Sequence, residues 1–254
     1  MSATVEFCGL PGAGKSRLVP EVESQLRVLG FATDLVTATP RPGRPSAARG
    51  AAKARLAMRH LTREPRLAAA VLAAAVRDPQ RRAQDRVRKL VNWLASEELV
   101  RSRCGDERLG LFDEGPIQAL WSIGLWGDHR PLLERLEGSP RLPCLTDQLV
   151  VVRVQPETAD RRLTRRGNPH SRIEGVIDPA MRQQHLRRGA GLLDELVAWW
   201  EQQTGRNATV IDADQDDPAP SGQPDARSML VSDAIAVSLA TGTGQRARSQ
   251  GGTR

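Results

Sequence analysis

Short apolar runs alternate with longer amphipathic stretches along the 254-residue chain. The apolar runs are TVEFC from Thr4, FATDLVTA from Phe31, RLGLFD ending at Asp113, QLVVVRV ending at Val154 and ATVIDA ending at Ala213. Each has the length of a buried strand, and helical patterns separate one run from the next. The alternation predicts a five-stranded parallel sheet with right-handed crossovers, in a three-layer α/β/α sandwich.

A long helical pattern near the C-terminal third carries its own start and stop signals. Asp178 is the expected N-cap, Pro179 suits the first turn, and Gly205 follows the last periodic residue. Trp199 and Trp200 lie within this pattern, and we assign them to core and surface packing on the helix. The run RSMLVSDAIAVSLA further along predicts a final helix.

Positive charge is concentrated in one part of the chain. Residues 41–104 hold 16 Lys or Arg against 5 Asp or Glu, a net charge of +11, and the remainder carries −4. An anionic partner would meet this segment first. Aromatic residues are not interleaved with its arginines, so the pattern does not favour nucleic acid as that partner.

The cysteines and the apolar runs indicate where in the cell the protein is located. Cys8, Cys104 and Cys144 lack the spacing of a disulfide framework or a zinc site. The N-terminus MSATVEF does not resemble a signal peptide, and the run LAAAVLAAAV is too short to span a bilayer. We therefore expect a cytoplasmic protein with no membrane association.

The stretch GLPGAGKS fits the phosphate-binding pattern G-x-x-x-x-G-K-[ST]. Its glycines let successive backbone N–H groups curl around an anion, and the following helix adds the positive end of its dipole. An apolar strand precedes the loop and a helix follows it, so we predict a P-loop NTPase fold. Lys15 would reach the β- and γ-phosphates of ATP or GTP, and the Ser16 hydroxyl would bind Mg²⁺. The residues expected to bind the nucleotide are Gly9, Pro11, Gly12, Ala13, Gly14, Lys15, Ser16 and Arg17.

Two acidic residues follow the third apolar run. Asp113 ends the run LGLFD, and Glu114 comes directly after it. In parallel sheets the ligand site lies at the carboxyl ends of the strands, which brings both carboxylates to the phosphate-binding loop. We expect Asp113 to bind Mg²⁺, and either Asp113 or Glu114 to accept the proton of an attacking hydroxyl.

The segment VQPETADRRLTRRGNPHSRIEG, from Val154 to Gly175, places several arginines three and four residues apart. Here the chain resembles the thymidylate-kinase-like branch of P-loop nucleoside and nucleotide kinases, in which an arginine-bearing lid closes over the nucleotide phosphates. The resemblance implies a lid over residues 156–175. On that resemblance, the candidate catalytic arginines are Arg162, Arg166 and Arg172.

The chain also departs from that branch. Thymidylate kinases carry Arg-Glu-Pro-Gly after the second strand and Asp-Arg-Tyr after the third, where the arginine helps to hold an acceptor phosphate. This chain has ATPRPG after the second predicted strand and DEGP after the third. Glu114 stands where the acceptor-binding arginine would be, so we expect an alcohol rather than a phosphate as acceptor. Thr39 precedes Pro40, so the base that deoxynucleoside kinases carry in a Glu-Pro pair is missing.

Residues 46–104, between the second and third predicted strands, read as two or more helices broken near Pro65 and Pro79. P-loop kinases build their acceptor-binding region at this point, and Arg41 and Arg44 are the candidate acceptor-binding residues. We interpret residues 1–240 as one kinase domain with this insertion. Residues 241–254 have the composition of a disordered tail.

The sequence therefore predicts a phosphotransferase that moves the γ-phosphoryl group of ATP or GTP to a hydroxyl of a small molecule. The acceptor is a nucleoside, an aminoglycoside or a nucleoside-type antibiotic, and the last two would make the reaction one of antibiotic resistance. Two alternatives stay open: a nucleoside monophosphate kinase, and a nucleotide-dependent ATPase or switch without small-molecule transfer. A homodimer is also left open.

Overall fold

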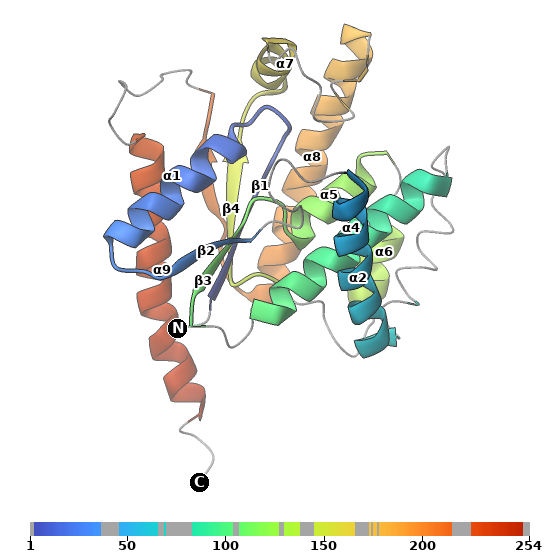
Figure 1. The fold of residues 1–254 in the computed structure, drawn as a ribbon. Coiled ribbons are helices and arrows are strands. Elements are labelled where there is room, and N and C mark those ends of the chain that lie inside the picture. The colour runs from blue at the N-terminus through green and yellow to red at the C-terminus, as the bar shows by residue number, and fades with distance from the viewer. Residues whose placement is uncertain are drawn as a thin grey trace.

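A five-stranded parallel sheet organises the chain, as its alternating pattern predicts (Figure 1). The computed structural model describes residues 3–36, 46–65, 83–103, 107–126, 130–137, 145–165, 175–176, 178–214 and 225–250, with the single residues 69 and 173. The strands are β1 (Ala3–Gly9), β2 (Thr33–Val36), β3 (Leu109–Phe112), β4 (Gln148–Arg153) and β5 (Thr209–Asp212). Their order is β2-β3-β1-β4-β5, so β1 is central and pairs with both β3 and β4.

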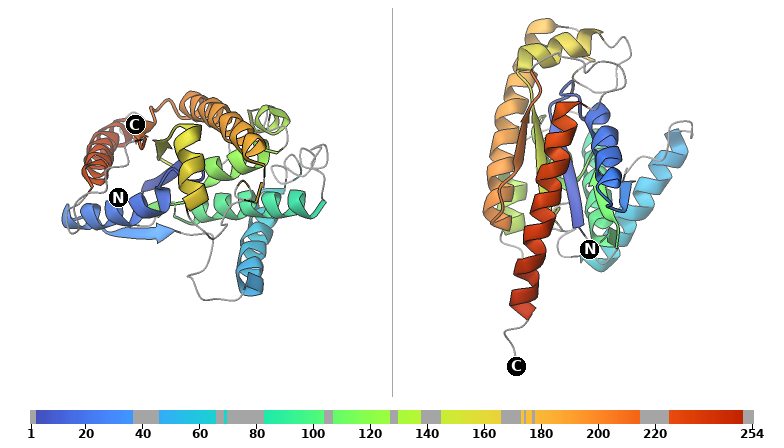
Figure 2. Two further views of the ribbon diagram at one scale, coloured as in Figure 1. Left: turned by 90° about the horizontal axis from the view of Figure 1, so that it is seen from above. Right: turned by 90° about the vertical axis from the view of Figure 1, so that its left-hand side faces the viewer.

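Helices cover both faces of this sheet (Figures 1 and 2). Helices α1 and α9 pack together on one face, α5 and α8 lie on the other, and α2 packs on α4 beside α5. Helix α7 lies beyond the carboxyl ends of the strands. The described helices are α1 (Lys15–Val28), α2 (Ser46–Arg63), α4 (Ala83–Arg103), α5 (Pro116–Gly124), α6 (Arg130–Glu137), α7 (Pro156–Arg165), α8 (Pro179–Thr204) and α9 (Ala226–Gln250).

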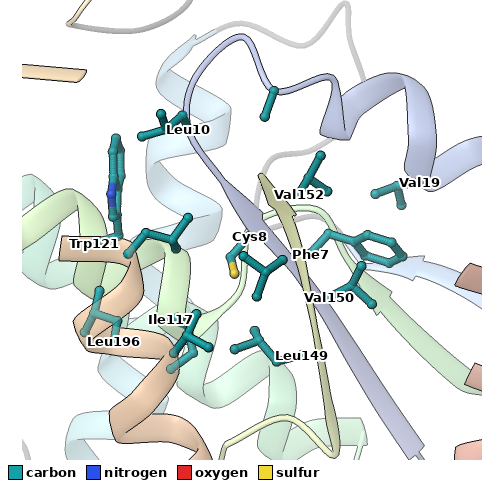
Figure 3. Packing of buried hydrophobic residues seen from close by; sticks show 14 of the residues in the cluster. Phe7, Cys8, Leu10, Val19, Ile117, Trp121, Leu149, Val150, Val152 and Leu196 are labelled. Atoms are coloured by element: carbon teal, nitrogen blue, oxygen red, sulfur yellow. The ribbon is translucent and has the colours of Figure 1, made fainter. Parts of the chain in front are cut away.

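The core forms on both sides of β1 because successive residues of a strand point to opposite faces. Phe7 points toward Val19 of α1, whereas Cys8 points toward Ile117 of α5 and Leu196 of α8 (Figure 3). All of these side chains are buried. Burial on both faces explains why the strand reads as an apolar run rather than as an alternating pattern.

Helix α8 begins and ends where the sequence predicts. The Asp178 carboxylate accepts the backbone N–H of Ala180 at 2.9 Å, and Gly205 ends the helix with φ 64°. Trp199 and Trp200 are both buried, with 5% and 0% exposure, so the expectation that one of them packs on the surface is wrong. The helix packs on α5 and α7.

The last described helix overlaps the segment predicted as a tail. Helix α9 ends at Gln250, so it runs through most of the segment 241–254, for which the composition predicts a disordered tail. In the insertion, α2 ends before Pro65, as expected, and Pro79 lies outside the described residues. None of the helices in the described part of the chain is long and apolar enough to cross a membrane.

Candidate active site

The loop between β1 and α1 has the shape that its glycines predict. Gly12 and Gly14 adopt φ values of 87° and 94°, which L-residues with a side chain rarely adopt. The N–H of Ala13 donates to the Leu10 carbonyl at 3.1 Å, which closes the turn. Gly14 is the N-cap of α1, so the positive end of the helix dipole lies at the loop. The loop therefore has the backbone form of an anion-binding nest.

Lys15 lies across this loop. Its Nζ donates to the carbonyl of Gly9 at 2.8 Å and to that of Leu10 at 3.4 Å. Arg17, also expected to bind the nucleotide, is in the first turn of α1, where it pairs with Glu21 at 3.1 Å and is largely exposed. Lys15 thus lies at the loop, whereas the side chain of Arg17 points along its own helix.

Asp113 follows β3, which pairs directly with β1, and this pairing brings the carboxylate to the loop. The Ser16 hydroxyl lies close enough to Asp113 to favour the ionised form of its carboxylate. Burial raises the pKa of Asp113 and neighbouring Glu114 raises it further, while Lys15 and the Ser16 hydroxyl oppose the shift. Glu114 itself is exposed. A carboxylate, a hydroxyl and an ammonium group therefore meet at the start of α1.

The donor set fits Mg²⁺, which prefers hard oxygen ligands and keeps several waters and phosphate oxygens in its shell. The Ser16 hydroxyl and the Asp113 carboxylate supply two such oxygens side by side. Among the described residues, no group of three or more His, Cys, Asp or Glu side chains could hold a metal ion. A magnesium ion here would take its remaining ligands from phosphate and water.

Arg162 of α7 reaches the same edge of the sheet. Its guanidinium donates to the Ala213 carbonyl, just after β5, at 2.7 Å, and to the Gly12 carbonyl of the loop at 3.5 Å. A Cβ at Gly12 would meet the Ala159 carbonyl oxygen at 2.8 Å and Leu163 Cγ at 3.2 Å. Helix α7 is therefore packed directly on the phosphate-binding loop.

Four of the residues proposed from the sequence lie outside the described part of the chain: Arg41, Arg44, Arg166 and Arg172. The structure thus brings Lys15, Ser16, Asp113 and Arg162 together and leaves the remaining arginines as predictions.

Two polar residues that sequence reasoning missed lie beneath the loop. Glu6 of β1 is fully buried, and burial raises its pKa to about 7. Gln118 of α5 accepts the backbone N–H of Gly9 on its Oε1 at 3.0 Å. A single acid inside the apolar run TVEFC, three residues before the loop, is the signal that could have identified Glu6, because an unpaired charge is costly in a buried strand.

The sheet order and the loop after β1 define a P-loop NTPase fold. Among solved structures, the chain is similar to a deoxyadenosine kinase from M. mycoides with the products dCMP and a flexible dCDP bound, at 12% identity and a TM-score of 0.51. It is also similar to that enzyme with bound dATP, at 14% identity and a TM-score of 0.52. Each match covers 92% of this chain and 99% of the other.

These similarities cover nearly the whole chain, and at such identities they establish the fold alone. The chain shares the fold of this deoxyadenosine kinase. No protein-family model and no curated protein sequence matches it.

Proposed function

We propose that this protein is a Mg²⁺- and NTP-dependent kinase that phosphorylates a hydroxyl group of a small molecule, with a nucleoside as the favoured acceptor class. The observation that carries the proposal is that the Ser16 hydroxyl lies beside the Asp113 carboxylate and favours its ionised form, next to Lys15 on the same loop. This arrangement joins the phosphate-binding loop to a strand-end carboxylate, the two parts that phosphoryl transfer needs.

The donor triphosphate would lie in the loop. The backbone N–H groups between Gly9 and Ser16 and the ammonium of Lys15 would bind its β- and γ-phosphates. Ser16 and Asp113 would hold Mg²⁺, which supplies positive charge to the phosphate oxygens when it is bound. Arg162, already fixed beside Gly12, adds positive charge at the same edge, where the transferring group becomes more negative.

The acceptor hydroxyl needs a base to take its proton. Asp113 is suited to this role because its raised pKa makes the carboxylate a better proton acceptor. Glu114 follows it on the same turn and is the second candidate. The two roles of Asp113, base and metal ligand, compete for one carboxylate, so Glu114 would act as the base if Asp113 serves the metal.

The fold and the two acidic residues Asp113 and Glu114 favour a nucleoside as the acceptor. The similar enzyme is a deoxyadenosine kinase, which favours a nucleoside over the aminoglycosides and nucleoside-type antibiotics that the sequence also allows. Asp113 and Glu114 would repel an acceptor phosphate, which disfavours a nucleoside monophosphate. ATP and GTP are both retained as donors, and a donor of this kind agrees with the cytoplasmic location predicted from the sequence.

Mass spectrometry of pooled acceptors tests the proposal. The pool holds nucleosides, nucleoside monophosphates and aminoglycosides with Mg²⁺ and either ATP or GTP, and wild type is compared with Lys15→Ala. We expect a phosphoryl mass gain on nucleosides that is absent in the variant. A gain on monophosphates alone would assign the monophosphate kinase reaction instead. NTP hydrolysis without any modified acceptor would support an ATPase or switch.

A further inference from the structure

Glu6 is a carboxylate in the centre of the fold that the proposed reaction does not use. It lies on β1 and is fully buried. A buried carboxylate is costly unless hydrogen-bond donors surround it, so its neighbours show what it stabilises. Those neighbours belong to the start of α5.

The carboxylate of Glu6 caps α5 from outside the helix. Its Oε1 accepts the backbone N–H of Gln118 at 2.8 Å. The backbone amides of Ile117 and Gly115 and the hydroxyl of Thr146 also favour the ionised form. The N-cap residue of α5 is Gly115, which has no side chain to cap the helix. Glu6 therefore satisfies a donor, the Gln118 N–H, that a local cap would otherwise satisfy.

Gly115 provides the space that this cap needs. A Cβ at Gly115 would lie 2.5 Å from Cδ and 2.7 Å from Oε2 of Glu6. The backbone of Gly115 is ordinary extended chain, with φ −104° and ψ −165°, so other residues could adopt its conformation. The atoms nearest to that Cβ all belong to the Glu6 side chain, so the space left by Gly115 is occupied by this carboxylate. Glu6 is thus packed against the turn that begins at Asp113.

Gln118 extends the contact to the phosphate-binding loop. Its backbone N–H donates to Glu6, and its side-chain Oε1 accepts the N–H of Gly9 at 3.0 Å. The Gly9 carbonyl in turn accepts Lys15 Nζ at 2.8 Å. One connected set of hydrogen bonds therefore runs from Glu6 through the first turn of α5 to the loop.

We propose that Glu6 is a positioning residue for the phosphoryl-transfer site, which fixes the turn after Asp113 and the Gly9 amide through the start of α5. The inference rests on the proposed function of the same site. Glu6 touches neither nucleotide nor acceptor in this scheme. It acts by positioning the turn after Asp113 and the phosphate-binding loop at Gly9, which would contact the nucleotide and the acceptor.

The positioning of these two segments by Glu6 depends on the charge of its carboxylate. Burial raises its pKa to about 7, so the ionised and protonated forms are both populated near neutral pH. The ionised carboxylate accepts backbone N–H groups more strongly than the protonated form does. The ionisable group that faces it from its own strand is the Cys8 thiol, whose pKa is raised chiefly by burial and also by Glu6. From α5 and from Thr146 the groups that face it are uncharged amides and a hydroxyl. The site should therefore become better ordered as pH rises through about 7.

Nucleotide binding at different pH values tests this inference directly. The affinity for a fluorescent ADP analogue with Mg²⁺ is measured between pH 6 and pH 8 for wild type and Glu6→Gln. Glutamine keeps the size of the side chain and stays neutral. The wild-type affinity should equal that of the variant at pH 6 and exceed it by about three- to tenfold at pH 8, the equivalent of one hydrogen bond. Ionisation of the nucleotide affects both proteins and cancels in the ratio.

Glu201→Gln is the matched control. Glu201 also accepts a backbone N–H on its carboxylate, that of Ala208 at 2.9 Å, but it does so at the opposite end of α8 from the loop. We expect the ratio of wild-type to control affinity to stay constant with pH. A constant ratio for Glu6→Gln as well would overturn the inference and leave the proposed function intact. A wild type that binds no nucleotide would overturn both.

Gln118→Leu provides a second variant in case Glu6→Gln does not fold. It keeps the backbone N–H that binds Glu6 and removes only the acceptor for Gly9. We expect the ratio of wild-type to Gln118→Leu affinity to rise between pH 6 and pH 8 as it does for Glu6→Gln. The reason is that the variant lacks the hydrogen bond that connects the first turn of α5 to Gly9. An affinity equal to that of the wild type at every pH would overturn the inference.

Discussion

The hydroxyl of Ser16, in the first turn of α1, lies beside the carboxylate of Asp113, which follows β3, and favours the ionised form of that carboxylate. This contact exists because β1 and β3 are parallel neighbours, so the loop after one strand meets the turn after the other. It places an oxygen pair suited to Mg²⁺ beside Lys15.

Asp113→Asn should separate activity from stability. We expect kcat to fall by about a hundredfold or more, because an amide is neither a base nor an anionic metal ligand. The free energy of unfolding should not fall, because burial disfavours the charge that the substitution removes. Steady-state kinetics and urea unfolding measure the two effects. Asp194→Asn, which affects an exposed pair with Arg153, serves as control and should change neither. Retained activity in Asp113→Asn would exclude both roles of Asp113.

Two glycines of α8 should respond to alanine in opposite directions. A Cβ at Gly189 would lie 2.9 Å from Cζ2 of Trp121 and 3.2 Å from Leu10 of the loop, so Gly189→Ala should destabilise the protein by about 1–3 kcal/mol. Gly191 has no atom within 4 Å of the same position, so Gly191→Ala should stabilise it by about 0.5–1 kcal/mol. Thermal and urea unfolding of both variants measure this difference. Equal effects would show that α5 and α8 are less closely packed at Trp121.

Arg162→Lys should weaken the contact between α7 and the loop. Lysine keeps the charge, but it cannot donate to the carbonyls of Gly12 and Ala213 with the fixed geometry of a guanidinium. We expect nucleotide affinity to fall by about three- to tenfold, as for one lost hydrogen bond. Arg161→Lys, at the exposed neighbouring position, is the control for titration calorimetry. If both variants bind nucleotide equally well, the contact of Arg162 with the loop has no part in nucleotide binding.

Acidic pH should destabilise the insertion through His60. This side chain of α2 is fully buried against Trp93 of α4, and burial lowers its pKa to about 4 from an ordinary 6.5. The unfolded chain therefore binds a proton that the folded chain does not, and stability is lost as pH falls below 6.5 toward 4. Relative to His60→Met, the wild type should lose about 1–2 kcal/mol between pH 7 and pH 5. Urea unfolding at the two pH values measures the loss, and a constant difference would contradict the assignment.

The sequence predicts the sheet and the loop because both depend on local patterns. The apolar runs mark the strands, Gly14 and Lys15 mark the loop, and Asp178 and Gly205 mark the ends of α8. The meeting of Asp113 with the loop follows from the general rule on strand ends. These features need no knowledge of which side chains touch.

The missed features depend on tertiary contacts. Gln118 is one of many glutamines until α5 is placed beside β1, and only then does its side chain meet Gly9. Gly115 reads as part of a turn, but its backbone is extended and its function is to leave space for Glu6. Arg162 was identified by a resemblance to lid arginines, whereas its contacts with Gly12 and Ala213 follow from the packing of α7.

Helix α9 leads away from the phosphate-binding loop, past the opposite edge of the sheet (Figures 1 and 2). From Ala226 to Gln250 it extends for about 36 Å along its axis, at 1.5 Å per residue. A fluorescent protein or a surface-immobilisation tag fused after this helix would therefore be carried clear of the nucleotide. The end of α9 at Gln250 therefore suits attachment for single-molecule and biosensor measurements.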